Sequence, residues 1–253
     1  MSPENPWIAR HRPGTGIRLR LFCLPYAGGG TVPFRDWSRD LPKGVEVVPV
    51  CLPGREARIE EPPLCEAREL AEAIRDGLRD DLDVPYALFG HSMGALLAFE
   101  LARRLRRDPG RQPVQLVVSG HRGPHLPYPV PPIRDLGAER FVEELRRYDG
   151  TPPEALGSAE LIELLLPALR ADFSVCETYE YVEEEPLECP IAAYGGLRDP
   201  DVGRADLEGW GRHTTAELVV RMFQGGHFYH QSCRPLFFQM LSRDLQRHIT
   251  DPA

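Results

Sequence analysis

Five consecutive residues, Gly90-His91-Ser92-Met93-Gly94, place a serine between two glycines in the pattern Gly-x-Ser-x-Gly. An apolar run at 86–89 precedes them, and a run of small and apolar residues at 95–99 follows. A strand, a sharp turn and a buried helix in this order form a nucleophile elbow, where the glycines make room for a turn that exposes the serine. The pattern predicts that Ser92 is a nucleophile. It also predicts that the backbone N–H of Met93 points at the carbonyl that the serine attacks.

A serine hydroxyl is a weak nucleophile, so it needs a base within hydrogen-bond reach and an acid that orients the base. In doubly wound hydrolases the order along the chain is serine, then acid, then histidine. Asp199 follows a predicted strand at 190–194, and His227 follows a predicted strand at 216–223. Because open α/β sheets collect their sites at the carboxyl ends of strands, we expect His227 to be the base and Asp199 its orienting acid.

Two neighbouring residues are alternatives for these roles. Asp201 lies two residues after Asp199 and is the alternative acid. His230 lies three residues after His227, so one helical turn would bring it to the same side, and it is the alternative base.

The second donor of an oxyanion hole is expected in the loop after the first long strand, which reads Tyr26-Ala27-Gly28. Small residues there let the backbone approach a substrate closely, so an N–H of this loop is the predicted donor. The glycines that follow, Gly28-Gly29-Gly30, lack the Gly-Lys-Ser/Thr sequence of a phosphate-binding loop.

Composition narrows the class of protein. At 253 residues with 42% hydrophobic residues, the chain is long enough to bury a core as one α/β domain, 1–253. A net charge of −8 argues against nucleic-acid binding. No apolar run has the length of a membrane span and no signal-peptide core precedes the fold, so we expect a cytoplasmic protein, monomeric by default. The cysteines are scattered without metal-ligand spacing, so we predict neither a metal nor a cofactor.

Strand-like and helix-like segments alternate, which predicts a mostly parallel central sheet with helices on both faces. The expected strands are 17–24, 45–51, 86–89, 115–119, 190–194 and 216–223. The expected helices are 34–41, 66–82, 95–107, 138–148, 158–181 and 235–249.

The alternation of strands and helices is interrupted at about 123–187, where prolines and then helix-like segments occur without an intervening strand. We interpret this stretch as a helical lid inserted over the active-site end of the sheet. A second local feature is a cluster of arginines at 103, 104, 106 and 107, which we interpret as a solvated helix face.

Together these residues resemble a type II thioesterase, the free-standing editing hydrolase of polyketide and nonribosomal peptide assembly lines. The resemblance covers residues 18–249 and depends most on Pro53-Gly54-Arg55-Glu56. The further matching segments are Leu24-Pro25-Tyr26-Ala27-Gly28-Gly29, Arg58 with Glu61-Pro62-Pro63, Gly90-His91-Ser92-Met93-Gly94-Ala95, Ser119-Gly120 with Pro124-His125, Leu169-Arg170-Ala171-Asp172-Phe173 and Gly225-Gly226-His227-Phe228. The chain departs from the family pattern at His121 and His230, where arginine and an apolar residue are expected.

The resemblance implies an α/β-hydrolase fold with a mobile helical lid. It implies a substrate that is an acyl thioester on the phosphopantetheine arm of an acyl or peptidyl carrier protein, and a role in removing stalled or misprimed acyl groups. It maps the triad onto Ser92, Asp199 and His227, with Ala27 and Met93 as oxyanion donors. For the segment with Arg55, Glu56 and Arg58, two interpretations stay open: a charged loop that forms ion pairs with itself, or a role near the carrier or its arm.

Two other functions use the same features. An oxyester hydrolase or a chain-releasing acyltransferase would use the same triad, because ester and thioester attack need the same groups. A carrier-binding module without catalysis is disfavoured, since every catalytic position is filled. The chain begins and ends close to the predicted fold, which favours a free-standing protein.

Overall fold

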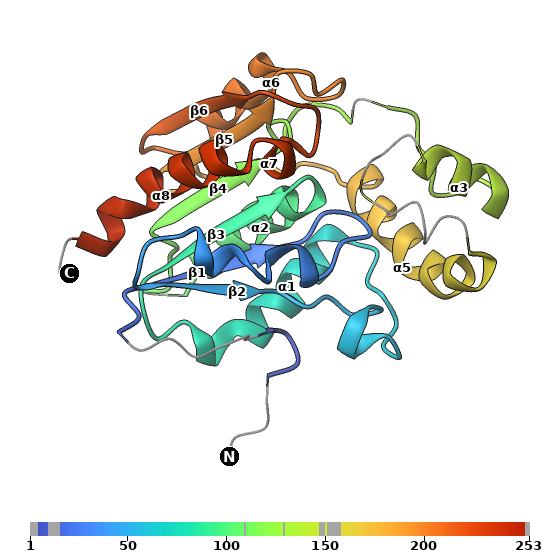
Figure 1. The fold of residues 1–253 in the computed structure, drawn as a ribbon, viewed down its shortest axis with the longest axis horizontal. Coiled ribbons are helices and arrows are strands. Elements are labelled where there is room, and N and C mark those ends of the chain that lie inside the picture. The colour runs from blue at the N-terminus through green and yellow to red at the C-terminus, as the bar shows by residue number, and fades with distance from the viewer. Residues whose placement is uncertain are drawn as a thin grey trace.

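The computed structural model describes residues 5–9, 16–108, 110–128, 130–146, 150 and 158–250. Within them, six parallel strands form one sheet in the order β2-β1-β3-β4-β5-β6 (Figure 1). The strands are β1 (Leu19–Leu24), β2 (Val45–Pro49), β3 (Tyr86–His91), β4 (Gln115–Ser119), β5 (Ile191–Gly196) and β6 (Leu218–Phe223). Each predicted strand is present, with ends that differ by a few residues.

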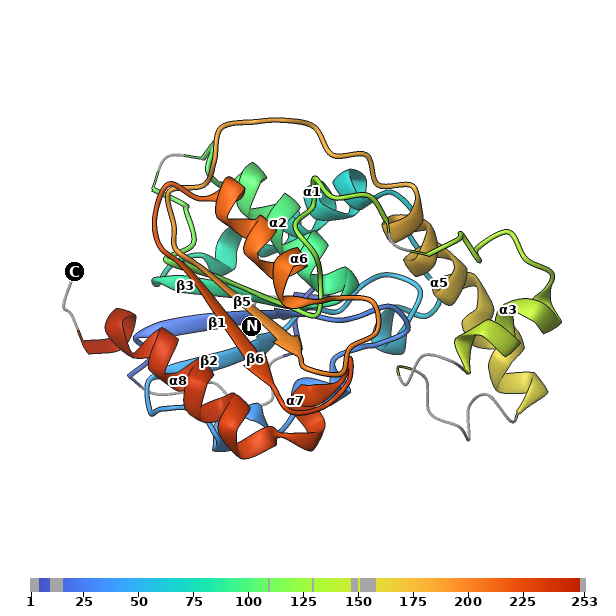
Figure 2. The same cartoon turned by 90° about the horizontal axis from the view of Figure 1, so that it is seen from above.

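Helices cover both faces of the sheet, which confirms the predicted α/β architecture. The helices are α1 (Ala67–Leu78), α2 (Met93–Leu105), α3 (Ala138–Leu145), α5 (Ala159–Glu177), α6 (Arg204–Glu208), α7 (Tyr229–Ser232) and α8 (Arg234–Thr250). Figure 2 shows α1, α2 and α6 on one face of the sheet and α8 on the other. The short helices α6 and α7 were not predicted, because each is little longer than one helical turn and so shows no repeating hydrophobic pattern.

A separate apolar core fills the space on each face. On one face, Leu70 of α1 and Leu97 of α2 are almost fully buried against the strands. On the other, Phe237 and Leu241 of α8 are fully buried in a cluster with Trp37. The inner strands β1, β3, β4 and β5 are buried on both sides, as expected for a parallel sheet covered by helices.

The predicted helix at 34–41 is wrong. Two 3₁₀ turns, η1 (Val32–Phe34) and η2 (Trp37–Arg39), occupy this stretch instead. Phe34 and Trp37 are both 2% exposed, and their rings pack edge-to-face on one another and on Phe89. A tight turn brings side chains three positions apart to the same side, so burial of both rings favours this geometry over a longer helix.

Two helices, α3 and α5, lie between β4 and β5 in sequence and extend beyond one end of the sheet (Figures 1 and 2). They share a small core of their own, in which Phe141 and Leu145 pack with Leu169 and Phe173. Within the described residues of 123–187, no strand interrupts them. The last residues of the predicted helix 138–148 and the start of the stretch before α5 lie outside the described residues. The function of this insertion as a lid stays a prediction.

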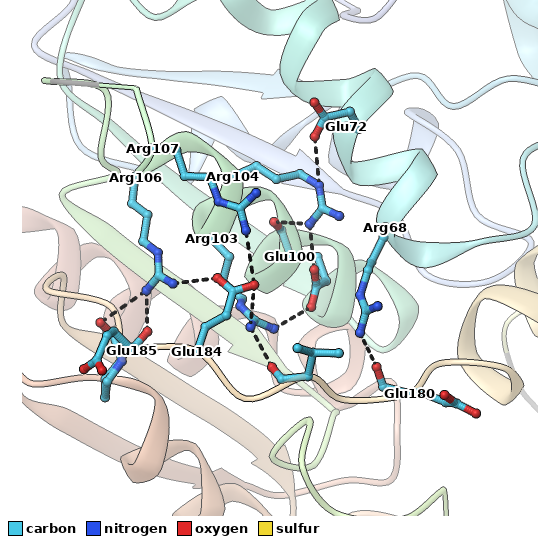
Figure 3. A network of polar contacts seen from close by, with 12 residues as sticks. Arg68, Glu72, Glu100, Arg103, Arg104, Arg106, Arg107, Glu180, Glu184 and Glu185 are labelled. Carbon is cyan, nitrogen blue, oxygen red and sulfur yellow. Dashed lines mark hydrogen bonds and ion pairs between the residues drawn. The ribbon is translucent and has the colours of Figure 1, made fainter.

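The interpretation of the arginine cluster on α2 as a solvated face is wrong for Arg103, Arg104 and Arg106, which are buried or half-buried; only Arg107 of the four is exposed. Arg103 is 2% exposed and pairs with Glu100 and Glu184, at 3.0 and 2.8 Å (Figure 3). Arg106 also pairs with Glu184, at 2.6 Å, and Arg103 donates to the carbonyl oxygen of Val182 at 2.6 Å. These contacts fasten residues 180–186, called the strap below, across α2 on the way from α5 to β5.

Among the described residues, none of the helices combines the length and the apolar character that a membrane span requires.

Candidate active site

The turn between β3 and α2 forces Ser92 into an unusual backbone conformation, with φ 54° and ψ −120°. Such strain in a residue other than glycine is characteristic of functional turns. A Cβ on Gly90 would lie 1.9 Å from the carbonyl oxygen of Gly94, and a Cβ on Gly94 would lie 2.2 Å from that of Leu24. Both glycines are therefore required by space, as the elbow pattern predicted.

His227 and Asp199 form a hydrogen-bonded pair beside this turn, with 2.7 Å between Nδ1 of His227 and Oδ2 of Asp199. The Asp199 side chain has no exposed surface, and that of His227 is 23% exposed. A carboxylate only accepts, so Nδ1–H of the histidine donates, and in the neutral ring Nε2 is left as an acceptor. This is the protonation pattern that a general base requires.

Backbone contacts hold the two loops that carry this pair together. The N–H of Leu197 donates to the carbonyl of Phe223, and the N–H of Arg198 donates to that of Gly225, both at 2.8 Å. A Cβ on Gly196 would lie 2.2 Å from the carbonyl oxygen of Gly226, so only glycine permits this close approach. The carboxyl ends of β5 and β6 thereby fix the separation of acid and base.

The structure distinguishes the alternative acid and base from the favoured ones. The N–H of Asp201 donates to the other carboxylate oxygen, Oδ1 of Asp199, at 3.0 Å, so Asp201 braces the acid through its backbone. His230 is buried, and its Nδ1 has no hydrogen-bond partner among the described residues. Of these four side chains, Asp199 and His227 are therefore the two that pair with each other.

Three further histidines surround His227. His91 and His230 have ring centroids 4.5 Å apart, and those of His91 and His227 are 4.9 Å apart. Burial lowers the pKa of His91 well below its usual range and lowers those of His121 and His230 to about 4. These three rings are therefore neutral near pH 7, and among the described residues His227 is the one of the four histidines with a carboxylate partner.

The loop after β1 brings Ala27 to the same site. Its turn is closed by the N–H of Gly29, which donates to the carbonyl of Tyr26 at 2.8 Å. Across the site, Met93 is the first residue of α2, where backbone N–H groups have no partner within the helix and the helix dipole is positive. The two predicted oxyanion donors thus belong to a hydrogen-bonded turn and to the first turn of a helix.

A cavity joins these groups. Its volume is about 120 Å³, it is partly open to solvent, and Ser92, His227 and Ala27 all line it. Most of its other walls are apolar, and many come from the insertion between β4 and β5. The apolar lining includes Leu96, Leu126, Val130, Phe173, Val202 and Phe228. The site can thus hold an apolar chain beside a serine and a histidine.

Sequence reasoning missed two side chains next to this site. Arg55 and Asp172 form a buried ion pair at 2.6 Å, and the Asp172 carboxylate also accepts the N–H of Gly28 at 2.7 Å. Both residues lay in segments that resembled the thioesterase family, but nothing local paired them across 117 positions. The interpretation of this loop as pairing with itself holds only for Arg58, which contacts Glu61 at 2.6 Å.

Over the ranges that the structure describes, no group of three or more histidine, cysteine or carboxylate side chains is arranged to hold a metal ion. The expectation that the site needs no metal or cofactor stays a prediction.

Residues 19–245 match the family described as Thioesterase domain. The gramicidin S biosynthesis protein GrsT of Aneurinibacillus migulanus is 44% identical over 229 residues, which cover 90% of each chain. Thioesterase PikA5 of Streptomyces venezuelae is 39% identical over 241 residues, which cover 93% of this chain and 85% of that protein. Among solved structures, the type II thioesterase BorB from the borrelidin biosynthetic cluster matches with a TM-score of 0.87 and 37% identity, over 94% of this chain and 97% of that one.

The match thus spans nearly the whole fold, including the elbow and both loops that follow β5 and β6. It confirms the resemblance to type II thioesterases inferred from the sequence, and the chain belongs to the thioesterase domain family, with the α/β-hydrolase fold.

Proposed function

We propose that this chain is a serine thioesterase that hydrolyses stalled or misprimed acyl groups from the phosphopantetheine arm of carrier proteins in polyketide or nonribosomal peptide biosynthesis. The observation that carries the proposal is the hydrogen bond from His227 to the buried Asp199, at a cavity that Ser92 also lines. Relatives described as a type II thioesterase and as a biosynthesis protein of gramicidin S support the substrate class.

In the proposed cycle, Oγ of Ser92 attacks the thioester carbonyl while Nε2 of His227 takes the hydroxyl proton. The N–H groups of Ala27 and Met93 stabilise the oxyanion of the tetrahedral intermediate. The C–S bond then breaks, and the imidazolium returns the proton to the leaving thiolate. Asp199 holds the tautomer and stabilises the imidazolium.

Hydrolysis of the acyl-enzyme completes the cycle. A water molecule gives a proton to Nε2 of His227 and attacks the ester carbonyl, and Ser92 leaves with that proton as the free acid is released. No cofactor takes part, because the phosphopantetheine arrives with the substrate. The apolar cavity walls fit a hydrocarbon-rich acyl group, and the insertion that supplies many of them would act as the lid.

Acyl or peptidyl carrier proteins are the proposed partners, and the enzyme acts on them as a cytoplasmic monomer. Both the carrier class and this chain are acidic, so docking is not driven by net charge attraction.

A substrate panel tests the proposal. Hydrolysis rates are compared for acyl groups on carrier proteins, for the same acyl groups on a small free thiol, and for matching p-nitrophenyl esters. The proposal predicts the highest kcat/KM for carrier-linked thioesters and no hydrolysis by Ser92→Ala. A preference for the oxyesters would favour an oxyester hydrolase instead. Transfer of the acyl group to an alcohol or amine rather than to water would favour a chain-releasing acyltransferase.

A further inference from the structure

The glycine loop, residues 26–30, is held by side chains that the proposed cycle does not use. Oδ2 of Asp172 accepts the N–H of Gly28 at 2.7 Å, and Nη1 of Arg55 donates to the carbonyl of Gly29 at 2.8 Å. The two side chains also bind each other through both arms, at 2.8 and 2.6 Å. One buried ion pair therefore binds this loop at two peptide groups, the one between Ala27 and Gly28 and the one between Gly29 and Gly30.

The pair is shielded from water, which makes its geometry rigid. Asp172 is 1% exposed and Arg55 is 7% exposed. A bidentate guanidinium–carboxylate contact fixes both side chains in one plane, and low solvent access leaves few competing partners. Next to Arg55, Glu56 accepts the N–H of Thr31 at 2.8 Å and so holds the far end of the loop.

The direction of the Ala27 N–H follows from this arrangement. The carbonyl of Tyr26 and the N–H of Ala27 belong to one planar peptide group and point in opposite directions. That carbonyl accepts the N–H of Gly29, so closing the turn also aims the N–H of Ala27. Asp172 and Arg55 form hydrogen bonds with the residues that close the turn, Gly28 and Gly29. They therefore fix the direction in which the N–H of Ala27 points.

We propose that Arg55 and Asp172 are positioning residues that hold the N–H of Ala27 toward the oxyanion, an inference that depends on the proposed thioesterase function. Asp172 belongs to α5, one residue before Phe173, which lines the cavity. The pair thus connects the wall of the acyl cavity to the oxyanion loop. Neither side chain touches the reacting atoms.

The test uses Asp172→Asn and Arg55→Lys, with Glu46→Gln as the matched control. Glu46 is also a buried carboxylate paired with an arginine, Arg20 at 2.6 Å, but it lies on β2 beside the start of β1, far from the glycine loop. Losing one oxyanion donor costs about 10²–10³ in kcat, and a displaced donor costs part of this. We therefore expect kcat to fall roughly 10- to 100-fold in both test variants and to stay unchanged in the control.

Two further readouts separate positioning from general structural damage. KM should change little, because the substrate carbonyl gains most of its contact with the oxyanion hole only in the transition state. A trifluoromethyl ketone analogue forms a tetrahedral adduct with the serine, so its Ki should rise in proportion to the loss of kcat/KM. The double variant Arg55→Met/Asp172→Leu removes both buried charges at once and should fold even where the single variants do not.

A kcat within threefold of the unmodified protein in any folded variant of the pair would overturn the inference. So would an unchanged Ki for the ketone beside a reduced kcat, or an equal loss of kcat in Glu46→Gln. Failure of the proposed function is seen separately, because in that case Ser92→Ala would retain hydrolysis whatever the pair does.

Discussion

Replacing His230 with leucine should make the protein less sensitive to acid. His230 is 8% exposed, and its Nδ1 has no partner among the described residues. Burial, followed by the nearby His227, lowers its pKa from 6.5 to about 4. Between these two values the unfolded chain binds a proton at this ring and the folded chain does not, so folding opposes protonation.

The sign and size of the effect follow from this difference. With a lowered pKa in the folded state, the stability linked to His230 is fully present above pH 6.5 and is lost as the pH falls toward about 4. At pH 5 the loss amounts to about 2 kcal/mol of unfolding free energy. A leucine has no such proton to bind, so the loss disappears with the side chain.

Urea unfolding at pH 7.5 and pH 5.0 measures this difference. Between pH 7.5 and pH 5.0, the unfolding free energy of the unmodified protein should fall by about 2 kcal/mol more than that of His230→Leu. The control is His248→Gln, because this histidine near the end of α8 is partly exposed and its pKa is lowered less. Equal losses in the unmodified protein and His230→Leu would refute the reasoning that the buried ring stays neutral.

Three other substitutions test separate parts of the structure. Asp199→Asn should lower kcat/KM by about 10²–10⁴, because an amide no longer holds the required tautomer of His227, and steady-state hydrolysis that stays within threefold would contradict this. Gly94→Ala should fail to accumulate as folded protein, since its Cβ would meet the carbonyl of Leu24 at 2.2 Å; a normal melting temperature would contradict it. Glu184→Gln should lower the unfolding free energy by about 1–2 kcal/mol by loosening the strap, with kcat unchanged, and urea unfolding beside an activity assay checks both.

Local signals explain what the sequence could predict. The elbow around Ser92 needs glycines at two fixed positions, because a Cβ at Gly90 or Gly94 would clash with a backbone carbonyl. Asp199 and His227 follow apolar strands directly, and parallel strands bring such positions to one edge of the sheet. Chain order and strand ends were therefore sufficient to bring these residues together.

Contacts between distant segments were beyond such reasoning. The partner of Arg55 lies 117 positions away on α5, and no pattern in either segment indicates that the two side chains pair. The same is true of Arg103, whose partner Glu184 lies in the strap, so its burial was mistaken for exposure. At 34–41 the burial of Phe34 and its neighbours favours two 3₁₀ turns over the predicted helix. Tertiary packing outweighs helix propensity in such cases.

The central claim is that Ser92 carries the acyl group between the carrier and water. Intact-protein mass spectrometry after rapid acid quenching of a reaction with acyl carrier substrate tests it directly, followed by peptide mapping. We predict an added acyl mass on the peptide that contains Ser92, and neither adduct nor hydrolysis in Ser92→Ala. Hydrolysis that continues in Ser92→Ala, or an acyl group found on a different residue, would contradict the account.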